Sequence, residues 1–152
     1  ALGMEIVSQD LDKAREEYLN LRRGDEPLEE ELFLHIATGL RHLAPHRGYV
    51  ADILETALSP FLRSTSCGAG EQVRIDHLET VAAAVAKHDG TNPPSFVAIN
   101  LYWALYLGVL AFWAQDSSPN QEDTLVLLDQ SMRLFVASLS TNQSQTEVNH
   151  GS

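Results

Sequence analysis

Apolar residues recur every three or four positions along most of the chain, and this spacing places them on one face of an α-helix. Ser-, Gly- and Pro-rich segments separate these periodic stretches. With no internal repeat and no convincing strand, the chain is expected to form an all-α, antiparallel bundle of about six helices. The pattern predicts amphipathic helices from Met4 to Arg23, between Asp25 and Pro45, between Gly48 and Pro60, from Glu71 to Lys87, and from Ser118 to Leu139.

One stretch, residues 96–114, breaks the amphipathic pattern because Asn100 is its only strongly polar side chain. As a helix it would be about 28 Å long at 1.5 Å per residue, which is enough to cross a bilayer. No cluster of Lys or Arg flanks it, and Trp103 and Tyr106 lie in its middle rather than at the ends, where interfacial aromatic residues gather. We therefore expect a helix that is buried by its own domain and by a second subunit.

The junction between the first two predicted helices carries clear terminal signals. Gly24 is expected to end the first helix. Asp25 then fits a helix cap, Pro27 fits a first turn, and the acidic run Glu29–Glu31 lies at the positive end of the helix dipole. A charge run of this kind predicts a solvated first turn.

The last predicted helix begins with a compact signal as well. Residues 118–121 read Ser-Pro-Asn-Gln, which fits the S-x-x-Q pattern of a capping box. Beyond residue 140 the sequence has no periodicity. We therefore expect one folded domain at 1–140 and a disordered tail at 141–152.

Composition limits the classes of function. Hydrophobic residues make up 44% of the chain, which is enough to enclose the core of one globular domain. Ten Lys+Arg against 21 Asp+Glu give a formal net charge of −11, and such a surface repels a phosphate backbone. A single cysteine, Cys67, forms no internal disulfide, which fits a reducing cytoplasm, and no secretion signal is visible at the N-terminus.

Candidate catalytic and metal-binding residues are few. His35, His42 and His46 lie at helical spacings, but Pro45 ends the helix before His46, and the other two border the apolar stripe. We interpret them as solvated or hydrogen-bonded side chains rather than metal ligands. The sequence has no serine-nucleophile elbow, no glycine-rich phosphate loop, and no neighbouring group that would activate Cys67. We expect no enzymatic activity, no metal and no cofactor.

The aromatic-rich stretch 96–114 carries two faces that suggest binding. Phe96, Asn100, Trp103 and Leu107 form an apolar wall with one amide, which is typical of a small-molecule pocket. The second face includes small residues that let another backbone approach closely; it consists of Leu101, Ala104, Leu105, Gly108 and Phe112. For any single ring, plain core packing remains the simpler interpretation.

These residues resemble a known family. The segments 105–113, 116–119 and 127–134 look like the last two helices of TetR/AcrR-type transcriptional regulators, and 43–47 resembles the turn between two earlier helices of the same domain. The resemblance implies an effector-binding and dimerisation domain in which the last two helices of two subunits form a four-helix bundle. It also implies a pocket among the helices from the second to the fifth.

Taken with the two faces, the resemblance gives two sets of expected site residues. The ligand-binding set is Phe33, Ile36, Leu40, Leu54, Leu58, Val81, Phe96, Asn100, Trp103 and Leu107. The dimer-interface set is Leu101, Ala104, Leu105, Gly108, Phe112, Leu125, Leu128, Met132 and Phe135. Family members carry a helix-turn-helix before the helix that matches 4–23, and this sequence has none, so DNA contact is expected only through a segment that the sequence lacks.

The leading hypothesis is therefore the regulatory domain of a cytoplasmic, homodimeric TetR-type repressor that senses a largely apolar small molecule. Binding would shift the first and third helices and change the spacing of two DNA-binding heads. One alternative is a helical homodimeric interaction protein without a ligand cavity, and another is an uncharacterised all-helical enzyme. A closed cavity on the order of a few hundred Å³, bounded by Phe33, Ile36, Leu54, Leu58 and Trp103, would favour the leading hypothesis.

Overall fold

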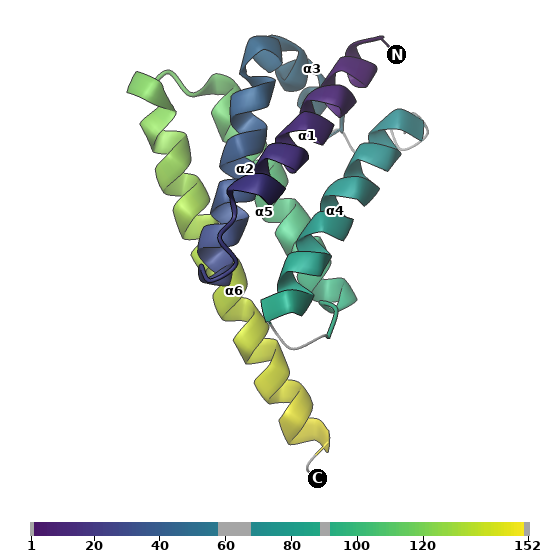
Figure 1. Ribbon diagram of the computed structural model, residues 1–152, viewed down its shortest axis with the longest axis vertical. Helices are drawn as coiled ribbons and strands as arrows, with labels where there is room; N and C mark the ends of the chain where they lie inside the picture. Colours follow the sequence, from purple (N-terminus) through teal and green to yellow (C-terminus); the bar gives the residue numbers. More distant parts are fainter. Residues whose placement is uncertain (1, 58–67, 89–91, 151–152) are drawn as a thin grey trace.

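The computed structural model (Figure 1) describes residues 2–57, 68–88 and 92–150, and over these residues it is helical with no strand, as the sequence predicts. Predicted residues Leu58 and Cys67 lie outside the described residues. The elements are α1 (Leu2–Leu21), α2 (Leu28–Leu43), the 3₁₀ turn η1 (Ala44–His46), α3 (Arg47–Ala57), α4 (Gly68–His88), α5 (Phe96–Gln115), the 3₁₀ turn η3 (Pro119–Gln121) and α6 (Glu122–His150).

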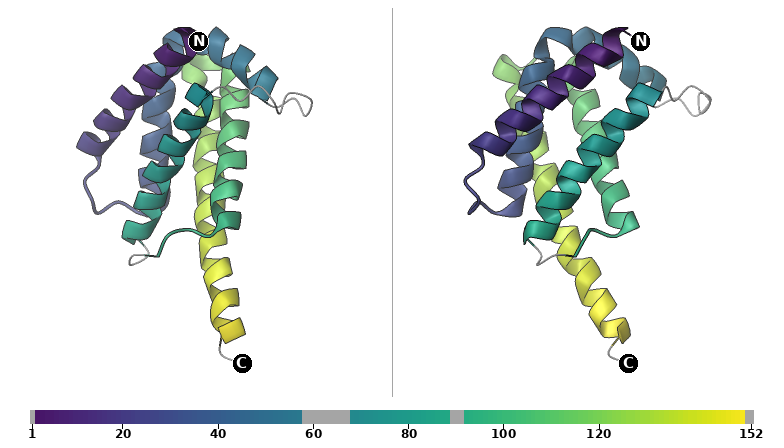
Figure 2. Two further views of the ribbon diagram at one scale, coloured as in Figure 1. Left: turned by 90° about the vertical axis from the view of Figure 1, so that its right-hand side faces the viewer. Right: turned by 45° about the vertical axis from the view of Figure 1, so that its right-hand side comes forward.

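Helix α2 lies at the centre of the bundle. It packs against α1, α4 and α6, whereas α5 packs against α3, α4 and α6. Figure 2 shows α1 and α4 on one side of the molecule and α5 and α6 on the other, with α2 between them. The fully buried apolar core comes mainly from α2, α5 and α6, with Tyr18 of α1 and Val81 of α4. Its largest members besides Tyr18 are Leu32, Ile36, Leu43, Tyr102, Trp113, Leu128, Met132 and Phe135.

The α1–α2 connection is built around a glycine and a buried carboxylate. Gly24 lies three residues after the end of α1 with φ +96°, a left-handed conformation that glycine adopts readily; α1 itself ends at Leu21, two residues before the predicted Arg23. The Glu26 carboxylate accepts hydrogen bonds from the backbone N–H groups of Arg23 and Gly24 at 3.0–3.4 Å. Asp25 is not the cap of α2: Pro27 occupies that position, with no side-chain cap bond.

The α5–α6 connection is organised by Asp116 rather than by the predicted capping box. The Asp116 carboxylate accepts from the Ser118 N–H and from both the N–H and the hydroxyl of Thr124. These hydrogen bonds hold the pKa of Asp116 well below its usual range. Ser118 Oγ accepts from the Asp123 N–H, five residues on, and makes no N-cap hydrogen bond to the turn that follows it. The Gln121 side chain accepts from Trp113 Nε1 at 3.0 Å, so the capping box is not formed.

Helix α6 continues further than the sequence pattern indicates. The tail expected to be disordered from residue 141 is helical as far as His150, and α6 extends beyond the rest of the bundle in Figure 1. Residues 141–150 contain neither Gly nor Pro. Lengthening an established helix costs far less than nucleating a new one, so the absence of apolar periodicity did not end this helix.

Candidate functional site

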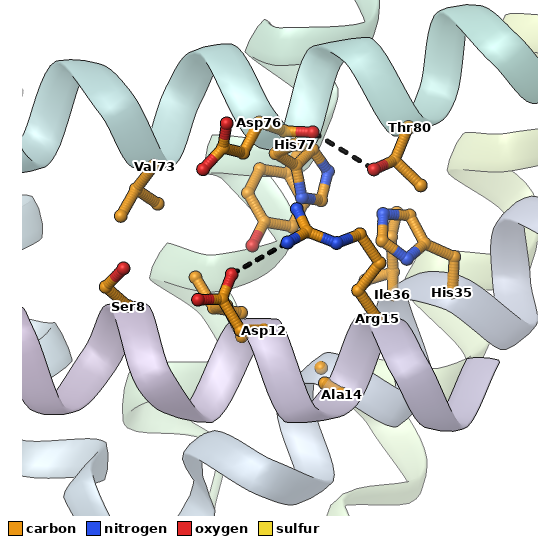
Figure 3. Close-up of a pocket in the computed structure, with 13 residues that line it drawn as sticks. Ser8, Asp12, Ala14, Arg15, His35, Ile36, Val73, Asp76, His77 and Thr80 are labelled. Carbon is orange, nitrogen blue, oxygen red and sulfur yellow. Dashed lines mark hydrogen bonds and ion pairs between the residues drawn. The ribbon is translucent and has the colours of Figure 1, made fainter. Parts of the chain in front are cut away.

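A small cavity lies between α1, α2 and α4, with one residue of α5 at its base (Figure 3). Its volume is about 30 Å³, which is room for one or two water molecules. The described lining residues are Ser8, Leu11, Asp12, Ala14 and Arg15 of α1, His35, Ile36 and Gly39 of α2, Val73, Asp76, His77 and Thr80 of α4, and Tyr106 of α5. The cavity therefore combines aromatic rings with charged and hydroxyl groups.

Aromatic and imidazole rings form a continuous series through this region. The His35 ring lies 4.8 Å from Tyr18 and 4.7 Å from His77, measured between ring centroids. His77 in turn stacks on Tyr106 at 4.1 Å and on Tyr102 at 5.6 Å. Because each of the four helices α1, α2, α4 and α5 contributes at least one of these rings, the series joins both sides of the bundle.

Hydrogen bonds fix most of these rings. The Tyr18 hydroxyl donates to the Glu31 carboxylate at 2.5 Å, and His77 Nε2 lies 2.6 Å from the Tyr102 hydroxyl. His35 differs: neither Nδ1 nor Nε2 has a hydrogen-bond partner among the described residues. Its ring is held by packing alone, while its hydrogen-bonding groups remain unpaired.

Burial keeps both imidazoles uncharged. It lowers the pKa of His35 to about 4, and the nearby positive charge of Arg15 acts in the same direction. Burial also lowers the pKa of His77 well below its ordinary value, with further contributions from His35 and Arg15. At neutral pH each ring therefore offers one N–H donor and one acceptor nitrogen.

Charged side chains lie around the cavity. The Arg15 guanidinium donates to Asp12 at 2.8 Å within α1, and both side chains are partly exposed. Across from them on α4, the backbone carbonyl of Asp76 accepts from the Thr80 hydroxyl at 3.0 Å. Figure 3 shows the Arg15 side chain reaching from α1 toward α4, between Asp12 and the two histidines.

Glu31 corrects the expectation of a solvated acidic turn at Glu29–Glu31. Its side chain is fully buried, with 0% exposure. Besides Tyr18, it contacts His88 at 3.2 Å and Lys87 at 3.5 Å on α4. Burial alone would raise the pKa of Glu31, but the hydrogen bonds from Tyr18 and His88 and the charge of Lys87 outweigh it and lower the pKa. Glu31 is the polar junction of α1, α2 and α4.

Of the expected ligand-binding residues, Ile36 lines this cavity. Leu40, Leu54 and Val81 belong to the apolar core, and Phe33, Trp103 and Leu107 pack partly buried against it. Phe96 is 82% exposed at the start of α5, and the Asn100 amide donates to its backbone carbonyl at 2.8 Å. The face predicted as a pocket wall is therefore not the face that meets the cavity; that role falls to Tyr106, one position before Leu107.

The sequence interpretation overlooked His35, His77 and Arg15. His35 was placed at the border of the apolar stripe, yet it is 8% exposed and lies inside it. A usable signal was present, because one face of α2 is buried at positions spaced alternately by three and one: Leu28, Glu31, Leu32, His35, Ile36, Gly39, Leu40 and Leu43. Because Glu31 and His35 are polar, the hydrophobic pattern did not assign them to the buried face.

The expected dimer-interface residues divide into two groups. Leu128, Met132 and Phe135 are fully buried within their own chain, against α2 and α5. On the surface, Ala104 and Gly108 are exposed, Phe112 is 43% and Leu125 40% exposed, and Leu101 and Leu105 are partly buried. The exposed apolar surface also includes Val97 on α5 and Val126 and Leu134 on α6, which the sequence interpretation did not include.

Helix α5 is far less covered than a core helix would be. Its length and its mean hydropathy of 1.7 match those of a membrane span, and 33% of its most apolar window is buried within the chain. The apolar residues that are not buried include four exposed positions, 97, 104, 108 and 112, and the partly buried position 101; these five are spaced by three and four and so run along one side of the helix. We call these five residues the α5 stripe.

Among the described residues, no group of three His, Cys, Asp or Glu side chains is placed to hold a metal ion. What the fold does combine is a small polar cavity between helices and a long apolar stripe on another helix. These are the features of a domain that can bind a small ligand and associate with another protein surface.

This class agrees with comparison to known families. The chain belongs to the family described as "Tetracyclin repressor-like, C-terminal domain", whose model matches residues 32–152. The resemblance that the α5–α6 segments indicated is thereby confirmed. No curated protein and no solved structure matches the chain. The family is one of regulatory domains, which generally dimerise and bind small-molecule effectors.

Proposed function

We propose that this chain is the effector-binding and dimerisation domain of a TetR-type transcriptional repressor of the cytoplasm. Its cavity would take the small-molecule effector, and α5 and α6 would form a four-helix bundle with those of a second copy. The observation that carries the proposal is the α5 stripe, which is apolar and lies open to solvent in the single chain of a family whose domains generally dimerise.

Gly108 lies in the middle of the α5 stripe and explains how two copies can approach. A Cβ atom built at Gly108 would meet nothing within 4 Å in the single chain. The absent side chain therefore serves no packing purpose inside the protomer. Gly108 and Ala104 have little or no side chain, so they leave a shallow region on α5 against which a helix of the partner can pack closely.

The effector would act through α1. In the proposed mechanism a ligand that binds one position of α1 better than another shifts the population toward that position. Helix α1 is tied to α2 and η1 by partly exposed polar pairs, Glu17 with His42 at 2.6 Å and Asp10 with His46 at 2.7 Å. A displacement of α1 would change the spacing of two helix-turn-helix segments, which lie outside this sequence, and DNA half-site spacing depends on that distance.

Substitution of Gly108 by leucine tests the association surface. We expect wild-type protein to be a dimer by light scattering coupled to size exclusion, and Gly108→Leu to be a monomer with unchanged helical content, because the new side chain overpacks only the contact between subunits. Gly48→Leu is the matched control: it also lies on a helix with nothing within 4 Å of its Cβ, but on α3, so it should remain a dimer. A monomeric wild type, or a Gly108→Leu dimer of wild-type stability, would show that the α5 stripe is not the contact.

A compound screen tests the effector part. Compounds that raise the melting temperature of the wild-type protein should lose this effect in Thr80→Trp, because an indole at residue 80 is larger than the cavity and would exclude a ligand from it. A dimer that no compound stabilises would instead favour the second candidate, a helical homodimeric interaction protein without a ligand cavity. The small cavity volume in this structure is the observation that favours this candidate.

A further inference from the structure

The strongest unexplained feature of the cavity is His35. Its two ring nitrogens are the buried side-chain atoms without a hydrogen-bond partner in the part of the chain that the structure describes. Buried polar groups in folded proteins are nearly always paired, because an unpaired group forfeits the bonds that water would give it. A buried, unpaired group on the wall of a cavity therefore points to a partner that enters the cavity.

The surroundings of His35 keep it in one place. Tyr18 and His77 pack on its ring, and each of them is itself hydrogen-bonded, Tyr18 to Glu31 and His77 to Tyr102. A hydrogen-bonding group held by neighbours that are themselves fixed is pre-organised for a ligand. Its partner would gain a bond without the cost of ordering the ring.

The charges around the cavity disfavour an ionic ligand. A cation would meet the guanidinium of Arg15, and an anion would meet the carboxylates of Asp12 and Asp76. Arg15 and Asp12 already compensate one another at 2.8 Å, and the overall charge of −11 further opposes an anion. An uncharged ligand avoids these conflicts.

The rings that line the cavity favour a ligand that itself contains a planar ring. His35, His77 and Tyr106 present three ring systems to the cavity, and planar rings pack well in stacked or edge-to-face contact with other rings. The present volume of about 30 Å³ is too small for a ring. Arg15 and Asp12 are partly exposed, and an ion pair of that kind costs little to open, so their outward rotation would enlarge the cavity.

We propose that the cavity binds an uncharged small molecule with a planar ring that carries a hydroxyl or amide group, and that this group hydrogen-bonds to the imidazole of His35. The inference rests on the proposed effector-binding function and names the chemical class of the effector. It replaces the largely apolar molecule that the sequence suggested with one that has a defined polar group.

Four probes of similar size test this class: phenol, toluene, benzoate and benzylamine. Phenol and toluene differ by a hydroxyl in place of a methyl group, so their ratio isolates the hydrogen bond. By NMR titration of the wild-type protein we expect phenol to bind about tenfold more tightly than toluene, since toluene leaves His35 unpaired. Benzoate and benzylamine should bind more weakly than phenol because of the charges described above.

Two variants assign the preference to His35. In His35→Leu the affinities for phenol and toluene should agree within about threefold, because no buried hydrogen-bonding group remains to distinguish them. Leu34→Ala, on the same helix but outside the lining of the cavity, should keep the preference of the wild type. The free His35→Leu protein should also melt at a higher temperature than wild type, whereas a histidine with a purely structural role would lower the melting temperature when replaced.

The outcomes separate this inference from the function on which it rests. Equal binding of phenol and toluene to wild type, or an unchanged preference in His35→Leu, would overturn the inference, even if shifts at Tyr106 and His77 showed that ligands enter the cavity. A lower melting temperature of His35→Leu would also overturn it. Failure of all four probes would refute this ligand class, while the compound screen with Thr80→Trp would still decide whether the domain binds an effector at all.

Discussion

The dependence of stability on pH is the sharpest quantitative test of the buried histidine. Burial lowers the pKa of His35 from its ordinary value of 6.5 to about 4. Below pH 6.5 the unfolded chain therefore takes up a proton that the folded chain does not. His35 therefore carries no protonation penalty above pH 6.5, and as the pH falls from 6.5 toward 4 the protonation of the unfolded chain progressively lowers the stability of the folded protein.

The magnitude follows from the two pKa values. A separation of one pKa unit corresponds to about 1.4 kcal/mol, so protonation of the unfolded chain at pH 5 removes about 2 kcal/mol from the free energy of unfolding. The variant His35→Leu lacks this proton site. Between pH 7.5 and pH 5 it should therefore lose about 2 kcal/mol less than wild type.

Urea unfolding monitored by circular dichroism at the two pH values measures this difference. Both proteins must be compared at one concentration, because association stabilises the folded state by mass action. His77, Arg15 and Glu31 are present in both proteins, so most of the difference comes from His35, with a smaller part from His77 because His35 also lowers the pKa of His77. Equal losses of stability in the two proteins would show that the imidazole is solvated or paired in the folded state, and would refute the assignment of His35 as a neutral, unpaired group.

Two further substitutions test the polar and apolar parts of the core. Glu31→Ala should lower the free energy of unfolding in urea by about 3–5 kcal/mol, because it leaves the buried Tyr18 hydroxyl without its acceptor, removes the counter-charge of Lys87 and removes the hydrogen-bond partner of His88. A change below about 1 kcal/mol would mean that Glu31 is solvated, as the sequence suggested. Phe135→Ala, made in the monomeric Gly108→Leu protein, should lower the free energy of unfolding by about 3–5 kcal/mol, because Phe135 is fully buried within one chain. If the substitution lowered stability only in the dimer, Phe135 would belong to the subunit contact.

Helical periodicity predicts most of this fold, and its successes have a clear physical origin. In α1 the helical spacing places Val7, Ala14 and Tyr18 on one face, and all three are buried. Shortly after α1, Gly24 adopts the positive φ that glycine tolerates best. Apolar spacing and terminal residues are local properties, so the sequence displays them directly.

The cavity could not be predicted in the same way because its key residues are polar. Glu31, His35 and His77 occupy core positions, but a hydrophobic pattern assigns such residues to the surface. Their burial is stabilised by partners on other helices, such as Tyr18 for Glu31 and Tyr102 for His77. Those partners are remote in the sequence, so only the assembled bundle reveals the site.

The contrast between the apolar core and the polar contacts around the cavity also bears on which helix a ligand would move in the proposed mechanism. Helices α2, α5 and α6 share the fully buried apolar core, and opening that core would create cavities at a high cost. Helix α1 buries Val7, Ala14 and Tyr18 against its neighbours, and it is also joined to α2 and η1 by polar pairs that are partly exposed and for which water can substitute. Helix α1 also forms one wall of the cavity through its residues from Ser8 to Arg15. In the proposed mechanism a ligand that enlarges the cavity therefore acts on α1, while the deeper α2–α5–α6 core keeps the association surface unchanged.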